Sequence, residues 1–457
     1  MGRAGFALDL DRCTGCSACA FACRIENDLA AGTSFRQVTT FNPERVASVP
    51  VLHLSLACNH CDRPACLAAC PTGAYTRNAA TGAVDLDASR CMGCRYCSWV
   101  CPYGAPQFDR SRGVMTKCTF CAPRVERGVP PACVVACPVD ALRMLESAAK
   151  AGPVVGAWGE RLEHISVPGF PDTGLEPALE LVSRIRWRPT TQEWRTWRPR
   201  GSHAPKWQRL RTEWPLAVFT FLVAVLVGWF GAGAWGGPLP RPLPFLALAA
   251  LGLGASALHL GRPARMWRVL GNMRGSWISR EVALVVAFLV AACAHFFLAP
   301  ASVPLIGATV VIGLAAVIAI DLVYRIRGQL TRAIPHSGMA TLTALYVAAL
   351  GSEIGWLAAG VGLAKFALYV ERHWRDWGTQ TVRHSILAVV RITLGLLVPA
   401  VAWITGGSPL DLLVLASVLV AEALDRAEFY AELDFLTPER QAALDLAVRV
   451  AARPVPV

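Results

Sequence analysis

Long apolar stretches fill the second half of the chain, and most have the length of a membrane-spanning helix. Because an α-helix rises about 1.5 Å per residue, about 20 apolar residues cross the hydrocarbon core of a bilayer. The run from 337 to 370 is too long for one span and is broken at Gly351, Ser352 and Glu353, so it predicts two short helices. The pattern therefore predicts an all-α membrane bundle of eight transmembrane helices over residues 212–433. The single spans lie near residues 214–235, 243–261, 279–298, 302–324, 385–405 and 410–430.

The composition shows that the two halves of the chain differ. Of 457 residues, 54% are hydrophobic and only 17% are charged, whereas a soluble protein carries about 25% charged residues. Nearly all of the 17 cysteines lie before residue 212. A secreted disulfide protein, a collagen-like chain and a disordered chain are excluded. We expect a cysteine-rich domain over residues 1–183, a basic linker over 184–211, the membrane bundle, and a tail over 434–457.

The linker combines basic and aromatic residues. It holds nine Arg or Lys residues, four Trp and one Glu. This mixture also occurs in nucleic-acid-binding segments, but here it leads directly into an apolar helix. We interpret it as a juxtamembrane belt, with Trp at the interface and Arg at the lipid phosphates, and we expect no nucleic-acid partner.

Basic residues also predict the orientation in the membrane. Eight spans place both chain ends on one side of the membrane. Of the Arg residues in the loops between the predicted helices and in the tail, nearly all lie on that side, whereas the opposite loops hold Arg241 and little else. By the positive-inside rule, the chain is a multi-pass protein of the inner (cytoplasmic) membrane with the cysteine-rich domain and the tail in the cytoplasm. Residues 1–11 agree, since they show neither an apolar signal sequence nor a twin arginine.

Four groups of four cysteines carry the chemistry of the first domain. The third group reads C-x2-C-x2-C-x3-C-P, the bacterial ferredoxin run in which three thiolates hold one cluster and the fourth reaches the neighbouring cluster. The second and fourth groups lengthen the middle of this run, and the first lacks the proline. The groups are Cys13, Cys16, Cys19, Cys23; Cys58, Cys61, Cys66, Cys70; Cys91, Cys94, Cys97, Cys101; and Cys118, Cys121, Cys133, Cys137.

Three other uses of these cysteines are less consistent with the pattern. A zinc ribbon does not need the ferredoxin run, disulfides need an oxidising compartment, and free thiols at this density are an oxidation liability. We therefore predict an α+β ferredoxin-like domain with four 4Fe-4S clusters, in which all sixteen cysteines are iron ligands. We expect the second group to exchange its closing cysteine with the third, and the first with the fourth, so that the clusters form a wire for single electrons.

Five short motifs make the first domain resemble the four-cluster subunit of dimethyl sulfoxide reductase and its relatives among the molybdenum enzymes. The resemblance covers about residues 5–180. It implies that the outer cluster pair, held by the first and fourth groups, faces a molybdenum bis-pterin subunit and that the cluster of Cys91, Cys94, Cys97 and Cys70 is nearest the quinone. Asp140 departs from the family, which often has Arg there. The motifs are CTGC at 13–16, ACNHC at 57–61, CPTGA at 70–74, CMGCRYC at 91–97 and CPYGAP at 101–106.

The membrane half resembles the anchor subunit of the same family. The resemblance covers about residues 212–433 and implies a haem-free anchor that reacts with quinone, so that two subunits are fused in one chain. The motifs are EWPL at 213–216, SALHLGRP at 256–263, SWISRE at 276–281, and Glu422, Arg426, Phe429 and Tyr430.

Five polar residues are candidates for the quinone site: His259, Arg280, Glu281, Glu422 and Arg426. We expect the quinone at the cytoplasmic ends of the second, third and eighth helices, because histidine titrates near neutral pH and a carboxylate can carry protons. Structural roles remain open for all five. In these alternative roles, His259 forms a hydrogen bond with a backbone carbonyl, Arg280 and Glu281 cap a helix, and Glu422 pairs with Arg426 four residues later. The seventeenth cysteine, Cys293, is interpreted as a buried inert thiol.

These observations predict a quinone-dependent oxidoreductase subunit whose substrate site lies on another polypeptide. Electrons pass between quinone, for example menaquinone in anaerobic respiration, and the molybdenum subunit of a dimethyl sulfoxide reductase or sulfite dehydrogenase type complex. The alternatives are an iron-sulfur quinone reductase or hydrogenase module without a molybdenum partner, and a purely structural membrane tether.

Overall fold

The computed structural model describes most of the chain in two compact units, one cysteine-rich and one helical, and each is considered by itself. The predicted linker and tail lie outside the described residues, except for the start of the first long helix. The described ranges are 5–9, 12–30, 33–41, 51–61, 64–101, 103–145, 206–325, 335–352, 354–374, 382–406 and 411–432.

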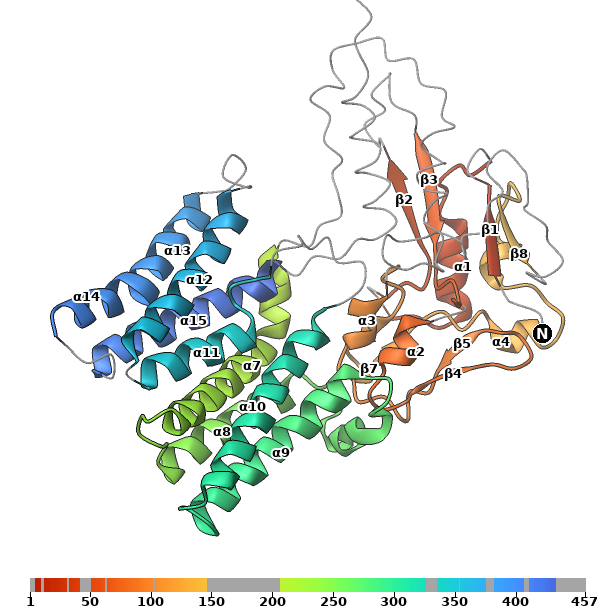
Figure 1. Ribbon diagram of the computed structural model, residues 1–457. Coiled ribbons are helices and arrows are strands. Elements are labelled where there is room, and N and C mark those ends of the chain that lie inside the picture. The colour runs from red at the N-terminus through yellow and green to blue at the C-terminus, as the bar shows by residue number, and fades with distance from the viewer. Residues whose placement is uncertain are drawn as a thin grey trace, which may run out of the picture. The chain divides into compact units, whose positions relative to one another are not determined.

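The described residues of the cysteine-rich unit form four antiparallel two-stranded sheets (Figure 1). The first and last strands pair with each other, with Gly5 opposite Leu145, so residues far apart in sequence close the unit. The pairs are β1 (Gly5–Leu8) with β8 (Leu142–Leu145), β2 (Gln37–Phe41) with β3 (Leu52–Leu56), β4 (Tyr75–Arg77) with β5 (Val84–Leu86), and β6 (Gln107–Asp109) with β7 (Val114–Thr116).

Short helices follow the cysteine loops of this unit. They are α1 (Ala18–Glu26), α2 (Ala65–Ala69), α3 (Tyr96–Val100), α4 (Ala122–Val125) and α5 (Ala132–Val135). In the first and third cysteine groups, a glycine with positive φ turns the backbone between the first two cysteines: Gly15 at +70° and Gly93 at +74°. The hydrophobic core includes cysteine side chains among apolar ones. The predicted α+β ferredoxin-type fold is confirmed.

Helices lie at the positions of all the predicted apolar segments of the second unit. The predicted break near 351 is confirmed, because one helix ends at Gly351 and the next begins at Gly355. The helices are α7 (Lys206–Ala234), α8 (Pro242–Leu258), the 3-10 helix η3 (Pro263–Asn272), α9 (Trp277–Phe297), α10 (Val303–Val323), α11 (Ala340–Gly351), α12 (Gly355–Trp374), α13 (Val382–Ile392), the π-helix η4 (Thr393–Leu397), α14 (Val398–Ile404) and α15 (Leu412–Glu432).

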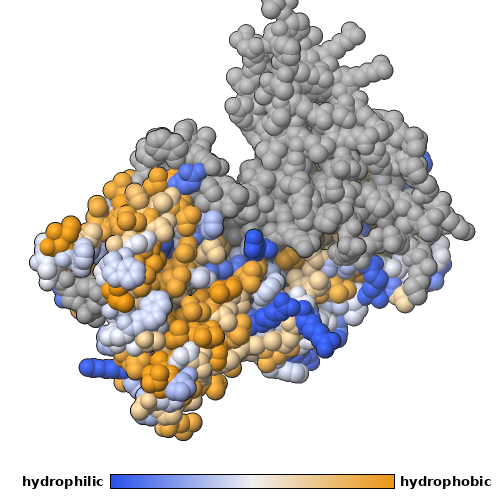
Figure 2. Space-filling model, viewed as in Figure 1, coloured by the Kyte–Doolittle hydropathy of each residue, from blue (hydrophilic) through white to orange (hydrophobic). Residues whose placement is uncertain are grey.

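Four helices in the described ranges are long and apolar enough to cross a membrane, or five if the bent pair of α8 and η3 is one span. The helical unit presents much hydrophobic surface (Figure 2), as a membrane protein requires. Helix α11 is short, and α12 and α15 carry several charged residues, so the number eight stays a prediction. The four spans are Glu213–Ala234, Trp277–Phe297, Val303–Val323 and Ile386–Ile404.

Helix α7 is the centre of this unit, because α8, α10, α11 and α15 all pack against it. Its approach to α11 is especially close at Gly228, where an added Cβ would lie 2.6 Å from the carbonyl oxygen of Ala344. A side chain there would force the two helices apart.

Candidate metal centres and buried charges

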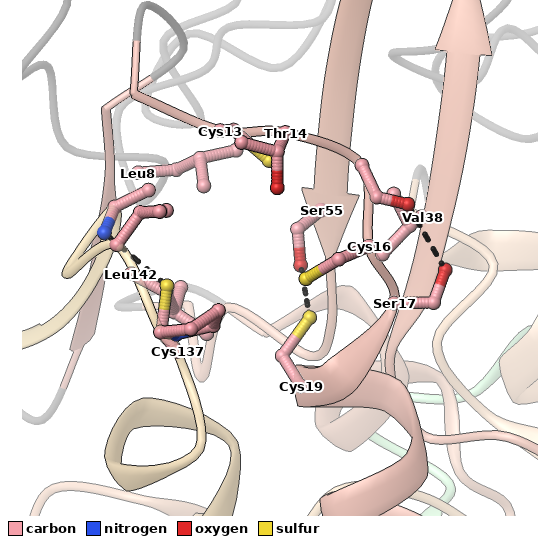
Figure 3. Close-up of a pocket in the computed structure, with 14 residues that line it drawn as sticks. Leu8, Cys13, Thr14, Cys16, Ser17, Cys19, Val38, Ser55, Cys137 and Leu142 are labelled. Atoms are coloured by element: carbon pink, nitrogen blue, oxygen red, sulfur yellow. Dashed lines mark hydrogen bonds between the residues drawn. The ribbon is translucent and has the colours of Figure 1, made fainter.

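The first three cysteines of the first group and the last cysteine of the fourth group surround one pocket (Figure 3). Cys13 and Cys16 lie on the loop before α1, Cys19 lies in its first turn, and Cys137 follows α5. Their sulfur atoms face a common space of about 330 Å³, counting the solvent at its mouth. The closing cysteine of the fourth group therefore joins the first group, as the expected exchange requires.

The other cysteines form three more sets with the same exchange. Cys23, which closes the first group, is in electrostatic range of Cys121 and Cys133. Cys101, which closes the third group, is in range of Cys66. The four sets are Cys13, Cys16, Cys19, Cys137; Cys118, Cys121, Cys133, Cys23; Cys58, Cys61, Cys66, Cys101; and Cys91, Cys94, Cys97, Cys70.

These sets suit iron-sulfur clusters better than single metal ions. Among the described residues, no three Cys, His, Asp or Glu side chains are close enough to share one ion. A cubane of four iron atoms is larger and holds its thiolates farther apart than one zinc ion does. When bound, the clusters would accept and release single electrons.

Backbone amides already point at the sulfur atoms. The N–H groups of Ala74 and Ala141 donate to Cys70 Sγ and Cys137 Sγ at 3.3 and 3.2 Å. Burial raises the pKa of the Cys23 thiol to about 12, so this thiol needs a bound cation to ionise at neutral pH. Amide donors to cluster sulfurs stabilise the negative charge that an added electron brings.

Two buried cations lie among the cysteine sets, and neither was predicted from the sequence. Arg36 is 1% exposed, donates to the carbonyl and hydroxyl oxygens of Ser55 at 3.3 and 3.0 Å, and has Cys133 as an electrostatic neighbour. Lys117 is 3% exposed, donates to the backbone carbonyl of Cys118 at 2.7 Å, and lies near the thiols of the second and third groups. Both would offset negative charge on thiolate-bound clusters at these sites.

The predicted quinone residues at one end of the helical unit have structural contacts. His259 caps the C-terminus of α8 and shares a hydrogen bond with the carbonyl of Ser256. Arg280 donates to the carbonyl oxygens of Met273 and Arg274 at 2.9 and 2.5 Å and lies over the Trp277 ring. Arg280 therefore holds the loop before α9, the capping role left open by the sequence.

Glu281 and Cys293, both on α9, differ in burial. Glu281 is 6% exposed and lies in electrostatic range of Arg426 and Asp321, so two of the predicted site residues, Glu281 and Arg426, come together. Cys293 is only partly buried, which corrects its predicted full burial. The predicted break residue Glu353 lies outside the described residues.

The predicted pairing of Glu422 with Arg426 is wrong. Glu422 instead forms an ion pair with Lys365 of α12 at 2.9 Å. It also accepts a hydrogen bond from the Thr343 hydroxyl at 2.6 Å. Arg426 donates to Thr220 at 3.0 Å and to the Gly338 carbonyl at 2.9 Å. Neighbouring helices thus bring partners closer than the next turn of α15 does.

Glu422 and Lys365 belong to a larger network of buried charges. Asp425 accepts from Arg391 and from Ser337, the latter at 2.9 Å, and its carboxylate is 3.7 Å from Lys365. Arg426 lies 3.8 Å from Asp321. The ion network, defined as Asp321, Lys365, Arg391, Glu422, Asp425 and Arg426, contains three cations and three carboxylates. Ionisable groups inside a membrane protein are costly unless they pair in this way.

Comparisons with known proteins concern the cysteine-rich unit. A 4Fe-4S dicluster domain matches residues 49–147. The probable anaerobic dimethyl sulfoxide reductase chain YnfG of Escherichia coli is 44% identical over 146 residues, which are 30% of this chain and 71% of that protein. A sulfite dehydrogenase subunit of Allochromatium vinosum is 36% identical over 162 residues, or 31% and 68% of the two proteins.

A third relative is named for a different activity. The thiosulfate reductase electron transfer subunit PhsB of Salmonella typhi is 43% identical over 139 residues, which are 30% of this chain and 71% of that protein. All three relatives are subunits of oxidoreductases that act on sulfur compounds. Through its first unit, the protein belongs to the family of iron-sulfur subunits of anaerobic dimethyl sulfoxide reductase and its relatives, and apolar helices of the kind that anchor a protein in a membrane follow in the same polypeptide.

Proposed function

We propose that the chain carries electrons through four 4Fe-4S clusters between the quinone pool and a separate catalytic subunit. The observation that carries this proposal is the exchange of closing cysteines among all four groups, which makes four complete sets of four thiols. A cluster moves one electron at a time and performs no chemistry on a sulfur substrate. The substrate site therefore belongs to a partner.

The partner is a molybdenum bis-pterin subunit of the dimethyl sulfoxide reductase or sulfite dehydrogenase type. The relatives named for these two activities, and the one named for thiosulfate reductase, support this class. The cluster unit and the partner lie on the cytoplasmic side of the membrane, a proposal that rests on the arginine asymmetry of the loops.

Quinone reacts at the end of the helical unit that holds His259, Arg280 and Glu281. Oxidation of a quinol releases two electrons and two protons, so the site needs a group that holds the ring oxygen and a route for protons. Imidazole suits the first role near neutral pH, and the buried Glu281 carboxylate suits the second.

Metal content tests the proposal directly. Four cubanes bring about sixteen iron atoms and as many acid-labile sulfides per chain. The protein is purified without oxygen, and iron, sulfide and zinc are measured per polypeptide. About eight iron atoms, or one zinc per cysteine group, would contradict the four-cluster wire.

A further inference from the structure

The helical unit has a pocket that none of the residues around His259 lines. It lies among α11, α12, α13 with η4, and α15, and it holds about 330 Å³ of open space including its mouth. Four side chains with polar ends line it: Tyr346, Lys365, Arg391 and Glu422. The remaining lining residues are Gly362, Phe366, Ile392, Gly395, Leu396 and Ala421.

The mouth of this pocket opens on an apolar surface. Phe366, Ile392 and Leu396 are partly exposed at the pocket, and Leu363 and Leu397 beside them are exposed large hydrophobic residues. In a membrane protein, such a surface faces lipid acyl chains. A ligand of this pocket therefore arrives from the lipid phase.

The polar side chains that line the pocket offer hydrogen-bond donors and an acceptor, but their charges are balanced. The charges of Lys365 and Arg391 are already paired with Glu422 and Asp425, and the Glu422 carboxylate itself lines the pocket. An anionic headgroup would meet this carboxylate without an unpaired cation to balance it. Arg391 is 7% exposed, yet its Nε has no hydrogen-bond partner among the described residues. Since an unpaired buried donor is costly, a neutral carbonyl oxygen suits it.

The backbone of the pocket is also specialised. The π-helix η4 interrupts the regular hydrogen bonds between α13 and α14, and the Tyr346 hydroxyl donates to the Gly395 carbonyl at 2.6 Å. Single turns of π-helix inside α-helices are frequent at functional sites. Both observations locate the irregular backbone at the pocket wall.

We propose that this pocket is a second binding site for the ring of a lipid-soluble quinone or quinol. The inference rests on the proposed quinone function and adds a site to it. The Arg391 guanidinium group donates to one ring oxygen, the Glu422 carboxylate accepts a hydrogen bond from the hydroxyl group of a quinol, and the isoprenoid tail leaves past Leu396 into lipid.

Photoaffinity labelling tests the second site. The full chain in lipid nanodiscs is illuminated with an azido-quinone that has an isoprenoid tail, with and without excess unlabelled quinone, and labelled peptides are identified by mass spectrometry. We expect competed labelling of α12 and of residues 391–396. Leu396→Trp fills the mouth and lowers this labelling at least 10-fold, whereas the control Leu397→Trp faces lipid and leaves it within 2-fold.

Each other outcome has a definite meaning. Competed label confined to the peptides around His259 would overturn the second site and leave the proposed function intact. Label at the pocket that Leu396→Trp does not reduce would also overturn it, since the probe would then be adsorbed on the surface. Absence of any competed label would remove the proposed quinone function itself, and the second site with it.

Discussion

Replacing Lys365 by Met removes the ammonium group that pairs with Glu422 and leaves two buried carboxylates with one less cation. At the observed 2.9 Å, the attraction within the Lys365–Glu422 pair is about 6 kcal/mol for an effective dielectric constant of about 20. Desolvation of the two ions offsets much of this gain, but removing one partner of a buried pair typically costs about 3–5 kcal/mol. For a unit of this size, that corresponds to a loss of about 10 °C in melting temperature.

Thermal stability in detergent measures this loss, with the folded fraction read by size-exclusion chromatography after heating. The control is Glu371→Gln on the same helix, because Glu371 is exposed and its removal should change little. The double variant Lys365→Met with Glu422→Gln restores charge balance and keeps an acceptor for Thr343. We expect it to regain most of the lost stability.

Two results would refute this reasoning. A melting temperature of Lys365→Met equal to that of the wild type would show that Glu422 is protonated and the pair is not ionic. A double variant whose loss equals the sum of the two single losses would show that the two groups do not interact.

Four further predictions concern the clusters, the quinone and the topology. Cys137→Ser should lower the iron content from about sixteen to about twelve per chain and leave the cluster of the other fourth-group cysteines intact, which electron paramagnetic resonance of the reduced protein can show; loss of that cluster instead would contradict the exchange. Arg36→Met should lower the reduction midpoint of an outer cluster, because a buried positive charge is lost; an unchanged redox titration would exclude an electrostatic role. His259→Ala should abolish quinol-driven reduction of the clusters, while a redox dye still reduces them; normal quinol activity would refute the role. A phosphatase fused after Val457 should be inactive, since the tail is expected in the cytoplasm, and strong activity would reverse the topology.

Cysteine spacing predicts the cluster unit well because the cysteines of one group lie close together in the sequence. Each C-x2-C pair spans a single turn, and Gly15 and Gly93 adopt the positive φ that these turns need. The exchange between Cys137 and the first group follows from the same ferredoxin pattern, although more than a hundred residues separate them. The burial of Arg36 was not predicted, because nothing in the sequence distinguishes it from the other Lys and Arg residues, 44 in all.

The ion network was only partly predictable, because tertiary packing decides its pairs. Glu422 and Arg426 are one helical turn apart in sequence, but Lys365 and Asp321 on other helices supply their nearest ionic partners. A signal for Lys365 was present, since a lysine inside an apolar stretch of a membrane helix usually faces a partner. The length and the break of that stretch predicted its two helices, but neither property indicates which helix supplies the partner.

The pairing of β1 with β8 has a consequence for the order in which the protein is made. Strand β1 and the cysteines at 13, 16 and 19 leave the ribosome well before the partners that complete them, Cys137 and Leu142–Leu145, which are synthesised last in this unit. A nascent polypeptide shorter than about 145 residues therefore holds an open thiol set and an unpaired strand edge, which is prone to wrong pairing. A cluster held by Cys13, Cys16, Cys19 and Cys137 would be completed only after synthesis of the whole unit, when translation has already moved on to the helices.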